Sequence, residues 1–180
     1  GTFAGNPKAT TKSETAFYYS ASADVQSSNI ITCPTSSPLS IVFKVNVPVS
    51  TARKRAVRIV DSTGTLMVTD FGNGTTSPAL FSLRYDASNF EFCPDFVYTA
   101  NINYIYALTW SPGDYVKMYV NGKFQAQSTN QRSTSGGSAF RVDLGNSLAG
   151  TFPLSGYLFY AYVFNRKLSP SEIRQLYIEP

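Results

Sequence analysis

Alternating apolar and polar residues predict most of the strands in this chain. Every second residue is apolar through residues 39–47 and again through residues 115–120. A period of two places successive side chains on opposite faces of a strand, so both segments are predicted to be half-buried. Lys44 and Asn46 point outward on the first strand. On the second, the outward set is Tyr115, Lys117 and Tyr119.

Turn residues connect these strands into hairpins. Asn121-Gly122 follows the second strand directly and supplies the two positive-φ residues of a type I′ turn. Further hairpins are expected between 56–60 and 65–69 and between 80–85 and 89–93. Other strands are expected at 16–21, 30–33, 98–110 and 140–144, the last with Arg141 and Asp143 facing outward.

One short helix is expected near the C-terminus, at 169–177. Ser169 is a good N-cap, Pro170 stands at the first helical position, and Glu172 completes a capping box. Residues 1–14 are polar and are predicted to form an extended arm, which leaves 15–180 as one domain. Many short strands with frequent turn signals predict a β-sandwich.

Four segments in the second half of the chain resemble one family when they are taken in order. They are Tyr106-Ala-Leu-Thr-Trp110-Ser-Pro-Gly, Met118-Tyr-Val-Asn-Gly-Lys123, Asp143-Leu-Gly145, and the stretch from Gly156 to Ile173. This series is similar to that of the laminin-G-like jelly rolls of the concanavalin A-like lectin/glucanase superfamily. The resemblance implies an all-β, antiparallel two-sheet jelly-roll sandwich with one short C-terminal helix. Phe159 replaces the Asp that the family usually has here, so a polar or metal role of that Asp cannot be transferred.

Composition favours an exposed protein. Charged residues make up 14% of the 180 residues, against about 25% in a typical globular protein, and Ser, Thr and Asn take their place. We therefore expect an extracellular, cell-surface or virion-surface location. The sequence shows no apolar run of about 20 residues, so membrane insertion is not expected.

The chain has a net charge of +4 and contains one basic cluster, Arg53-Lys54-Arg55 with Arg58. It is interpreted as a solvated hairpin loop, or alternatively as a contact for an acidic partner such as a sulfated or sialylated glycan. Four charges in one loop make a small footprint for nucleic acid, so no nucleic-acid partner is expected.

The chain contains two cysteines, Cys33 and Cys93, each followed by proline, and no histidine. A Cys/His zinc site is therefore excluded, and two thiols cannot complete a tetrahedral site alone. In an oxidising compartment the pair would close a loop of about 60 residues and add roughly 4 kcal/mol of stability. The alternative is two separate buried thiols.

The residue inventory argues against catalysis. A triad that uses histidine is impossible, and the Glu-x-Asp-x-x-Glu pattern of the superfamily's glucanases is missing. Glu91 and Asp95 are the nearest pair of carboxylates, but Pro94 is expected to interrupt their strand. We therefore expect a protein that is not an enzyme.

Sugar binding remains the leading hypothesis, because sugars stack on aromatic faces and their hydroxyl groups form hydrogen bonds with Asn, Asp and Arg side chains. For each tyrosine the alternative is ordinary cross-strand packing. By parity Trp110 shares a face with Leu108 and Tyr106, which favours a core or rim anchor over sugar stacking. The candidate glycan-binding residues are Tyr115, Lys117, Tyr119, Asn46, Arg141 and Trp110, with Asn73, Asp86 and Asn130 as alternatives at the rim.

The resemblance implies a non-catalytic carbohydrate-binding or adhesion module whose partner is a glycan or a glycosylated receptor. The alternative is a purely structural or protein-binding sandwich without a glycan site. Calcium is common in the family and stays open as a cofactor, as does assembly into a homo-oligomer. Calcium needs clustered oxygen ligands, whereas the carboxylates are isolated at Asp70, Asp86, Asp95 and Asp114.

Overall fold

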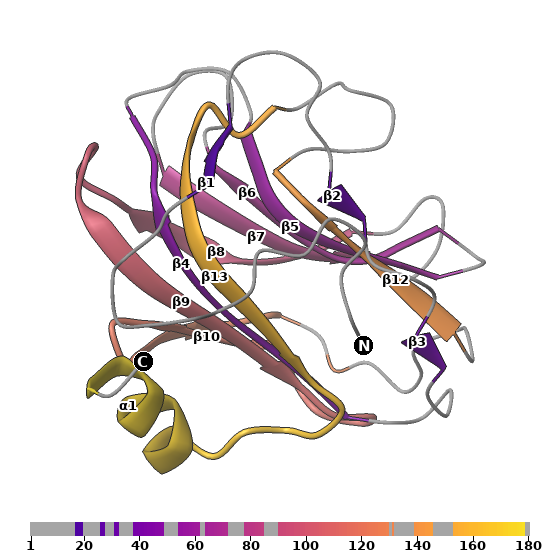
Figure 1. Cartoon of the computed structure of the whole chain (residues 1–180). Coiled ribbons are helices and arrows are strands. Elements are labelled where there is room, and N and C mark those ends of the chain that lie inside the picture. The colour runs from indigo at the N-terminus through magenta and orange to yellow at the C-terminus, as the bar shows by residue number, and fades with distance from the viewer. Residues whose placement is uncertain are drawn as a thin grey trace.

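The computed structural model describes residues 17–19, 26–27, 31–32, 38–48, 54–61, 64–71, 78–84, 90–129, 131, 139–145 and 153–178. These form two antiparallel sheets and one short helix, which confirms the predicted jelly-roll sandwich (Figure 1). Cys33, the arm 1–14 and the rim residues Asn73, Asp86 and Asn130 lie outside the described residues. The disulfide and these rim sites therefore stay predictions.

The first sheet has the strand order β1-β13-β4-β9-β10-β11. Its strands are β1 (Phe17–Tyr19), β13 (Gly156–Phe164), β4 (Leu39–Asn46), β9 (Asn103–Trp110), β10 (Lys117–Val120) and β11 (Lys123–Gln127).

The second sheet has the order β2-β12-β5-β6-β7-β8, with β3 also paired to β12. Its strands are β2 (Gln26–Ser27), β3 (Ile31–Thr32), β12 (Ala139–Leu144), β5 (Lys54–Asp61), β6 (Gly64–Phe71), β7 (Pro78–Arg84) and β8 (Phe90–Val97). The helix is α1 (Pro170–Ile178).

An aromatic cluster joins the two sheets through the core. Tyr106 of β9 stacks on Phe43 of β4, with ring centroids 5.5 Å apart, and meets Phe71 of β6 edge-on at 5.4 Å. Such contacts add about 0.5–1.5 kcal/mol beyond the burial of the rings. The predicted alternation of residues 39–47 is confirmed, because the odd-numbered members of β4 face this core.

The strand β8 departs from the prediction at Pro94. It continues from Phe90 to Val97 instead of stopping at the proline. Its register with β7 shifts between Ala79 and Phe81, which leaves Pro94 and Asp95 opposite one residue. Since β8 is the last strand in the order of its sheet, a residue without an N–H group is tolerated in this bulge.

The predicted turn at Asn121-Gly122 is confirmed, with φ of 49° and 74°. Asn121 also completes β9, because its Oδ1 accepts the N–H of Ile105 at 2.9 Å. A Cβ on Gly122 would lie 3.2 Å from the Cβ of Tyr177. The turn therefore needs glycine both for its backbone and for the close approach of α1.

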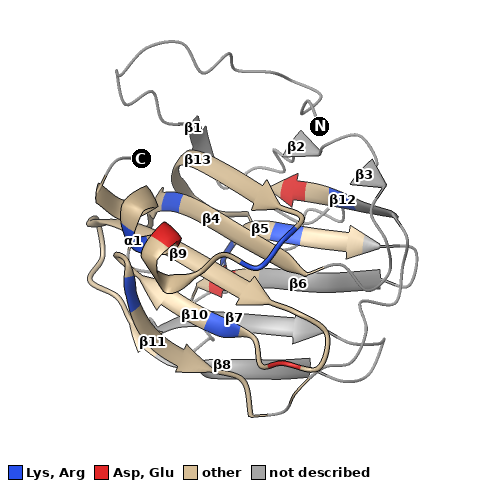
Figure 2. Cartoon of the chain, turned by 90° about the horizontal axis from the view of Figure 1, so that it is seen from below, with Lys and Arg blue, Asp and Glu red and all other residues tan. Residues whose placement is uncertain are grey.

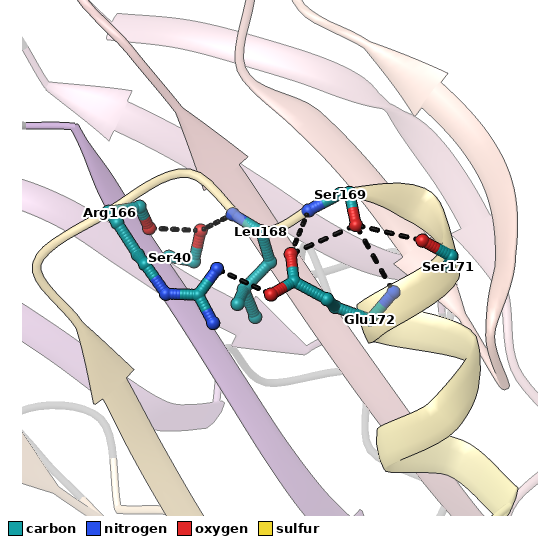
Figure 3. Close-up of polar contacts among 6 residues, drawn as sticks. All are labelled: Ser40, Arg166, Leu168, Ser169, Ser171 and Glu172. Carbon is teal, nitrogen blue, oxygen red and sulfur yellow. Dashed lines mark hydrogen bonds and ion pairs between the residues drawn. The ribbon is translucent and has the colours of Figure 1, made fainter.

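The predicted capping box of α1 is also confirmed (Figure 3). The N–H of Ser169 donates to Oε2 of Glu172 at 2.8 Å, and the N–H of Glu172 donates to Oγ of Ser169 at 3.3 Å. Arg166 adds an ion pair to Glu172 at 2.6 Å. These contacts fix both the start of the helix and the segment before it.

Ser40 of β4 ties this segment to the sheet. Its buried hydroxyl donates to the carbonyl of Arg166 at 2.9 Å and accepts the N–H of Leu168 at 2.9 Å (Figure 3). One side chain thus satisfies two backbone groups that belong to the approach to α1.

We predict that Ser40→Ala lowers the free energy of unfolding by about 1–3 kcal/mol, because it leaves a buried N–H and a carbonyl without their partner. Urea denaturation measures the change. Ser171→Ala is the matched control, since its hydroxyl contacts only Ser169 among the described residues and at an exposed position. Equal losses in the two variants would show that Ser40 does not anchor the helix.

We predict a pH dependence that originates at Glu172. Hydrogen bonds from the backbone of Ser169, from Arg166 and from the Ser169 hydroxyl lower its pKa from 4.5 to about 2. Because the pKa of Glu172 is lower in the folded than in the unfolded protein, its ionised form stabilises the fold at pH values above 4.5. This contribution disappears as the pH falls from 4.5 towards 2. The difference in Tm between the parent protein and Glu172→Gln should shrink over that interval. A difference that stays constant down to pH 2.5 would contradict the assignment.

Candidate functional site

The register of the first sheet arranges its outward side chains in four rows that cross the strands. Each row takes one residue from β9, one from β4 and one from β13. The rows are Asn103–Asn46–Tyr157, Ile105–Lys44–Tyr160, Ala107–Val42–Tyr162 and Thr109–Ser40–Phe164. On the next strand, β10, Tyr119 extends the third row and Lys117 the fourth.

The helix α1 and the segment before it cover the β10 side of this outer face. Leu168 and Ile173 pack there on Val42, Ile105 and Tyr119. Only 4% of Tyr119 is exposed, and burial raises its pKa. The prediction that Tyr119 offers its ring to a sugar is therefore wrong: the residue does face outward from the sheet, but the helix occupies that side.

Two more candidate residues are not on this face. Trp110 is 1% exposed and belongs to the core, so the core interpretation is confirmed and sugar stacking is not available. Arg141 lies on β12 in the other sheet, where it bonds Asp143 at 2.8 Å. The grouping of Arg141 with the outward residues of β10 is therefore wrong.

Tyr115 lies just before β10, and Lys117 is its first residue. The strand therefore begins at Lys117 and not at Tyr115 as expected. Lys117 lies 3.7 Å from the carboxylate of Asp114. Lys167 also donates a hydrogen bond to Asp114, and this bond is the largest cause of the lowered pKa of the Asp114 carboxyl group. These charges therefore hold the loop before β10 against the segment that leads to α1.

The basic cluster also differs from the prediction, because Lys54, Arg55 and Arg58 belong to the strand β5 and not to a hairpin loop. Arg55 forms a buried bidentate ion pair with Asp70, with hydrogen bonds of 2.8 and 3.0 Å. Asp70 and Asp114, two of the carboxylates described above as isolated, are each paired with a cationic side chain. Among the described residues, no group of three His, Cys, Asp or Glu side chains is placed to hold a metal.

The open part of the outer face is centred on the first row, Asn103–Asn46–Tyr157, which we call the Asn–Asn–Tyr row. Nδ2 of Asn46 donates to Oδ1 of Asn103 at 2.8 Å. Tyr157, next to Asn46 on β13, is 44% exposed. The row thus combines an aromatic ring with two amides whose mutual orientation is fixed, and of its members only Asn46 had been predicted.

An aromatic ladder continues along β13 from this row. Tyr160 stacks on Tyr162 with centroids 4.9 Å apart, and Tyr162 meets Phe164 edge-on at 6.4 Å. Because these rings contact one another along the strand, the ladder stiffens the face. The sequence signal for this ladder is the aromatic residue at every second position of 160–164, which becomes a row of contacting rings only once the segment is placed on one strand.

Charge is sparse around the row. Figure 2 shows β13 without a charged residue and β4 with a single basic one, which is Lys44. The amino group of Lys44 lies 4.9 Å from the centroid of the Phe159 ring. Across β4, β9 and β13 the open face is therefore aromatic and polar, with one cation in the second row.

Gly156 allows β13 to approach β4 at the Asn–Asn–Tyr row. A Cβ at this position would lie 2.5 Å from the carbonyl oxygen of Asn46, closer than real contacts allow. The absence of a side chain on Gly156 thus sets the separation between Asn46 and Tyr157.

Comparison with known proteins identifies the fold independently. The sequence model of a family described as the Concanavalin A-like lectin/glucanases superfamily matches residues 19–174. No curated protein matches the chain by sequence.

Solved structures of the same fold include a native heptameric SAP-like pentraxin from Limulus polyphemus. It has a TM-score of 0.62 and 15% identity, over 81% of this chain and 72% of the pentraxin. A structure of botulinum neurotoxin type C, whose cell entry depends on two ganglioside molecules, has a TM-score of 0.65 and 16% identity, over 89% of this chain. A botulinum neurotoxin DC binding domain in complex with rat synaptotagmin II has a TM-score of 0.61 and 15% identity, over 86% of this chain.

The chain spans only 41% and 42% of those two toxin structures. At these identities the likeness shows the fold alone. Within the described residues, no helix is long and apolar enough to cross a membrane.

We predict that Gly156→Ala lowers stability by roughly 1–3 kcal/mol, because the new methyl group forces β13 away from the Asn46 carbonyl. Differential scanning fluorimetry would show the lower Tm. Ala161→Gly, on the same strand, is the contrasting control: it introduces no clash, and it should cost only about 0.5–1 kcal/mol for the lost methyl contact and the added backbone freedom. An unchanged Tm for Gly156→Ala would show that the two strands are not held at this separation.

Proposed function

The chain belongs to the concanavalin A-like lectin/glucanase superfamily, and we propose that it is a non-catalytic carbohydrate-binding module. Its partner is a glycan or a glycosylated receptor, and its setting is an exposed protein: secreted, on a cell surface or on a virion. The observation that carries the proposal is the Asn–Asn–Tyr row, where an exposed ring lies beside two amides.

The chemistry of the row suits a sugar. A pyranose presents C–H groups on its face, which pack on an aromatic ring, and hydroxyl groups around its edge, which need both donors and acceptors. Tyr157 supplies the ring, while Asn46 and Asn103 supply amide donors and acceptors. Because all three belong to paired strands, little conformational freedom is lost when a ligand binds.

Ion pairing supports the non-catalytic assignment. Asp70, Asp114, Asp143 and Glu172 each contact a Lys or Arg side chain. Glycoside hydrolysis needs two carboxyl groups on either side of the scissile bond, one of them able to donate a proton. A hydrogen bond from Lys167 lowers the pKa of Asp114, and one from the backbone of Ser169 lowers the pKa of Glu172, so these two carboxylates are poor proton donors near neutral pH.

The neighbours in fold offer parallels. The ganglioside dependence named for botulinum neurotoxin type C and the synaptotagmin complex of the DC binding domain are properties of those proteins. They support a surface-recognition role here only by analogy of fold. The synaptotagmin complex also keeps the alternative of a protein-binding sandwich under test.

We predict that Tyr157→Ala weakens binding of the glycan identified on an array by about tenfold, or 1.4 kcal/mol, as expected when a stacking ring is lost. Biolayer interferometry with the purified glycan measures the affinity. Tyr177→Ala is the control, because this tyrosine of α1 is nearly as exposed, at 42%, and packs near Gly122, outside the row.

Two outcomes would overturn the proposal. Unchanged glycan affinity in a normally folded Tyr157→Ala protein would place the site elsewhere. No binding to any arrayed glycan, with calcium present and at high protein density, would favour the structural or protein-binding alternative.

A further inference from the structure

We propose that the Asn–Asn–Tyr row selects the acetamido group of an N-acetylhexosamine. This inference rests on the proposed carbohydrate-binding function and specifies its ligand class. Its basis is the set of hydrogen-bonding groups that the pair Asn46 and Asn103 leaves available after bonding to each other.

The two amide side chains keep different hydrogen-bonding groups available. Each Asn side chain has two N–H donors and one carbonyl acceptor. The bond of 2.8 Å uses one N–H of Asn46 and a lone pair of Asn103. No other hydrogen bond is seen for either side chain among the described residues. Asn46 therefore keeps its carbonyl oxygen as an acceptor, and Asn103 keeps both N–H groups as donors.

A secondary amide is the natural complement of that pair. It is planar, and it holds one N–H donor and one C=O acceptor in fixed positions. In the acetamido group the N–H would donate to Oδ1 of Asn46 and the carbonyl would accept from Nδ2 of Asn103. A single hydroxyl group has only one proton to donate and must rotate to choose its partner, so it would gain less from a fixed donor and acceptor.

Tyr157 completes the recognition of the acetamido group. It lies next to Asn46 in the register of β13 with β4, and its ring is partly exposed. The methyl carbon of the group would pack on this ring, which removes apolar surface from water. A sugar that carries a hydroxyl group instead has no methyl carbon to bury at this position.

The test compares chitotriose with cellotriose, which differ only by acetamido and hydroxyl groups at C2. Isothermal titration calorimetry on the whole chain should show chitotriose binding at least about tenfold more tightly, the result of gaining one hydrogen bond and a buried methyl group. The same comparison on an array uses terminal N-acetylgalactosamine against galactose, which covers a different linkage and ring epimer.

Asn103→Asp is the decisive variant. It keeps the shape of the side chain but replaces both N–H donors by an acceptor, so the preference for the acetamido sugar should disappear. Asn101→Asp adds the same charge two residues away, at an exposed turn position with φ of 61° that Asp also tolerates, and it should leave the preference intact. Loss of the preference in both variants would assign the effect to charge and overturn the proposal.

The remaining outcomes separate this inference from the general function. If arrayed glycans bind but each hydroxyl sugar binds as tightly as its acetamido counterpart, the selectivity is wrong and the carbohydrate-binding function stands. If sugars bind only when they carry a carboxylate or sulfate, then Lys44 in the second row is the determinant, and the acetamido inference fails. If no glycan binds, both proposals fail together.

Discussion

The unbroken pairing of β4 with β9 is the constraint on which the rest of the structure depends. It runs through eight residue pairs, from Leu39 opposite Trp110 to Asn46 opposite Asn103, without a bulge. Because side chains alternate along both strands, one register decides two surfaces at once. The inward set carries Phe43 and Tyr106 into the core. A slip of one residue would expose that cluster and bury the outward amides.

The outward surface is then divided by the C-terminal segment. Ser40 holds the backbone of residues 166 and 168, and the capping box starts α1 directly afterwards. The close approach at Gly122 sets how far the helix lies towards β10. The β10 side therefore serves as a second, smaller core, and solvent reaches the face mainly along β13 and the ends of β4 and β9. The position of the candidate site follows from the side that the helix covers.

Local signals in the sequence predicted much of this architecture. Alternation predicted the inward face of β4, the Asn-Gly pair predicted the hairpin at 121–122, and the Ser-Pro-x-Glu pattern predicted the start of the helix. Each of these signals depends only on residues that are close together in the sequence. The site was harder to predict from the sequence, because Asn46 and Tyr157 become neighbours only when two strands far apart in the chain pair with each other. Tyr119 was placed correctly on the outer face, yet its burial depends on a helix some fifty residues later in the chain. Arg141 shows the same limit: alternation predicts the face of a strand, but not the sheet to which the strand belongs.

The proposed site consists of three side chains on a sheet, and this construction has consequences for how it would bind a sugar. The strands hold the two amides and the ring in place before the ligand arrives, so the entropic cost of ordering the protein is small. The contact area of three side chains is also small, and affinity for a single sugar should therefore be weak. Modules of this kind gain strength when several copies engage a multivalent surface, since each later contact becomes intramolecular. If the Asn–Asn–Tyr row is the proposed site, rigid placement and weak individual affinity follow from the same feature, its construction on paired strands, and both would suit a chain that acts in repeated copies.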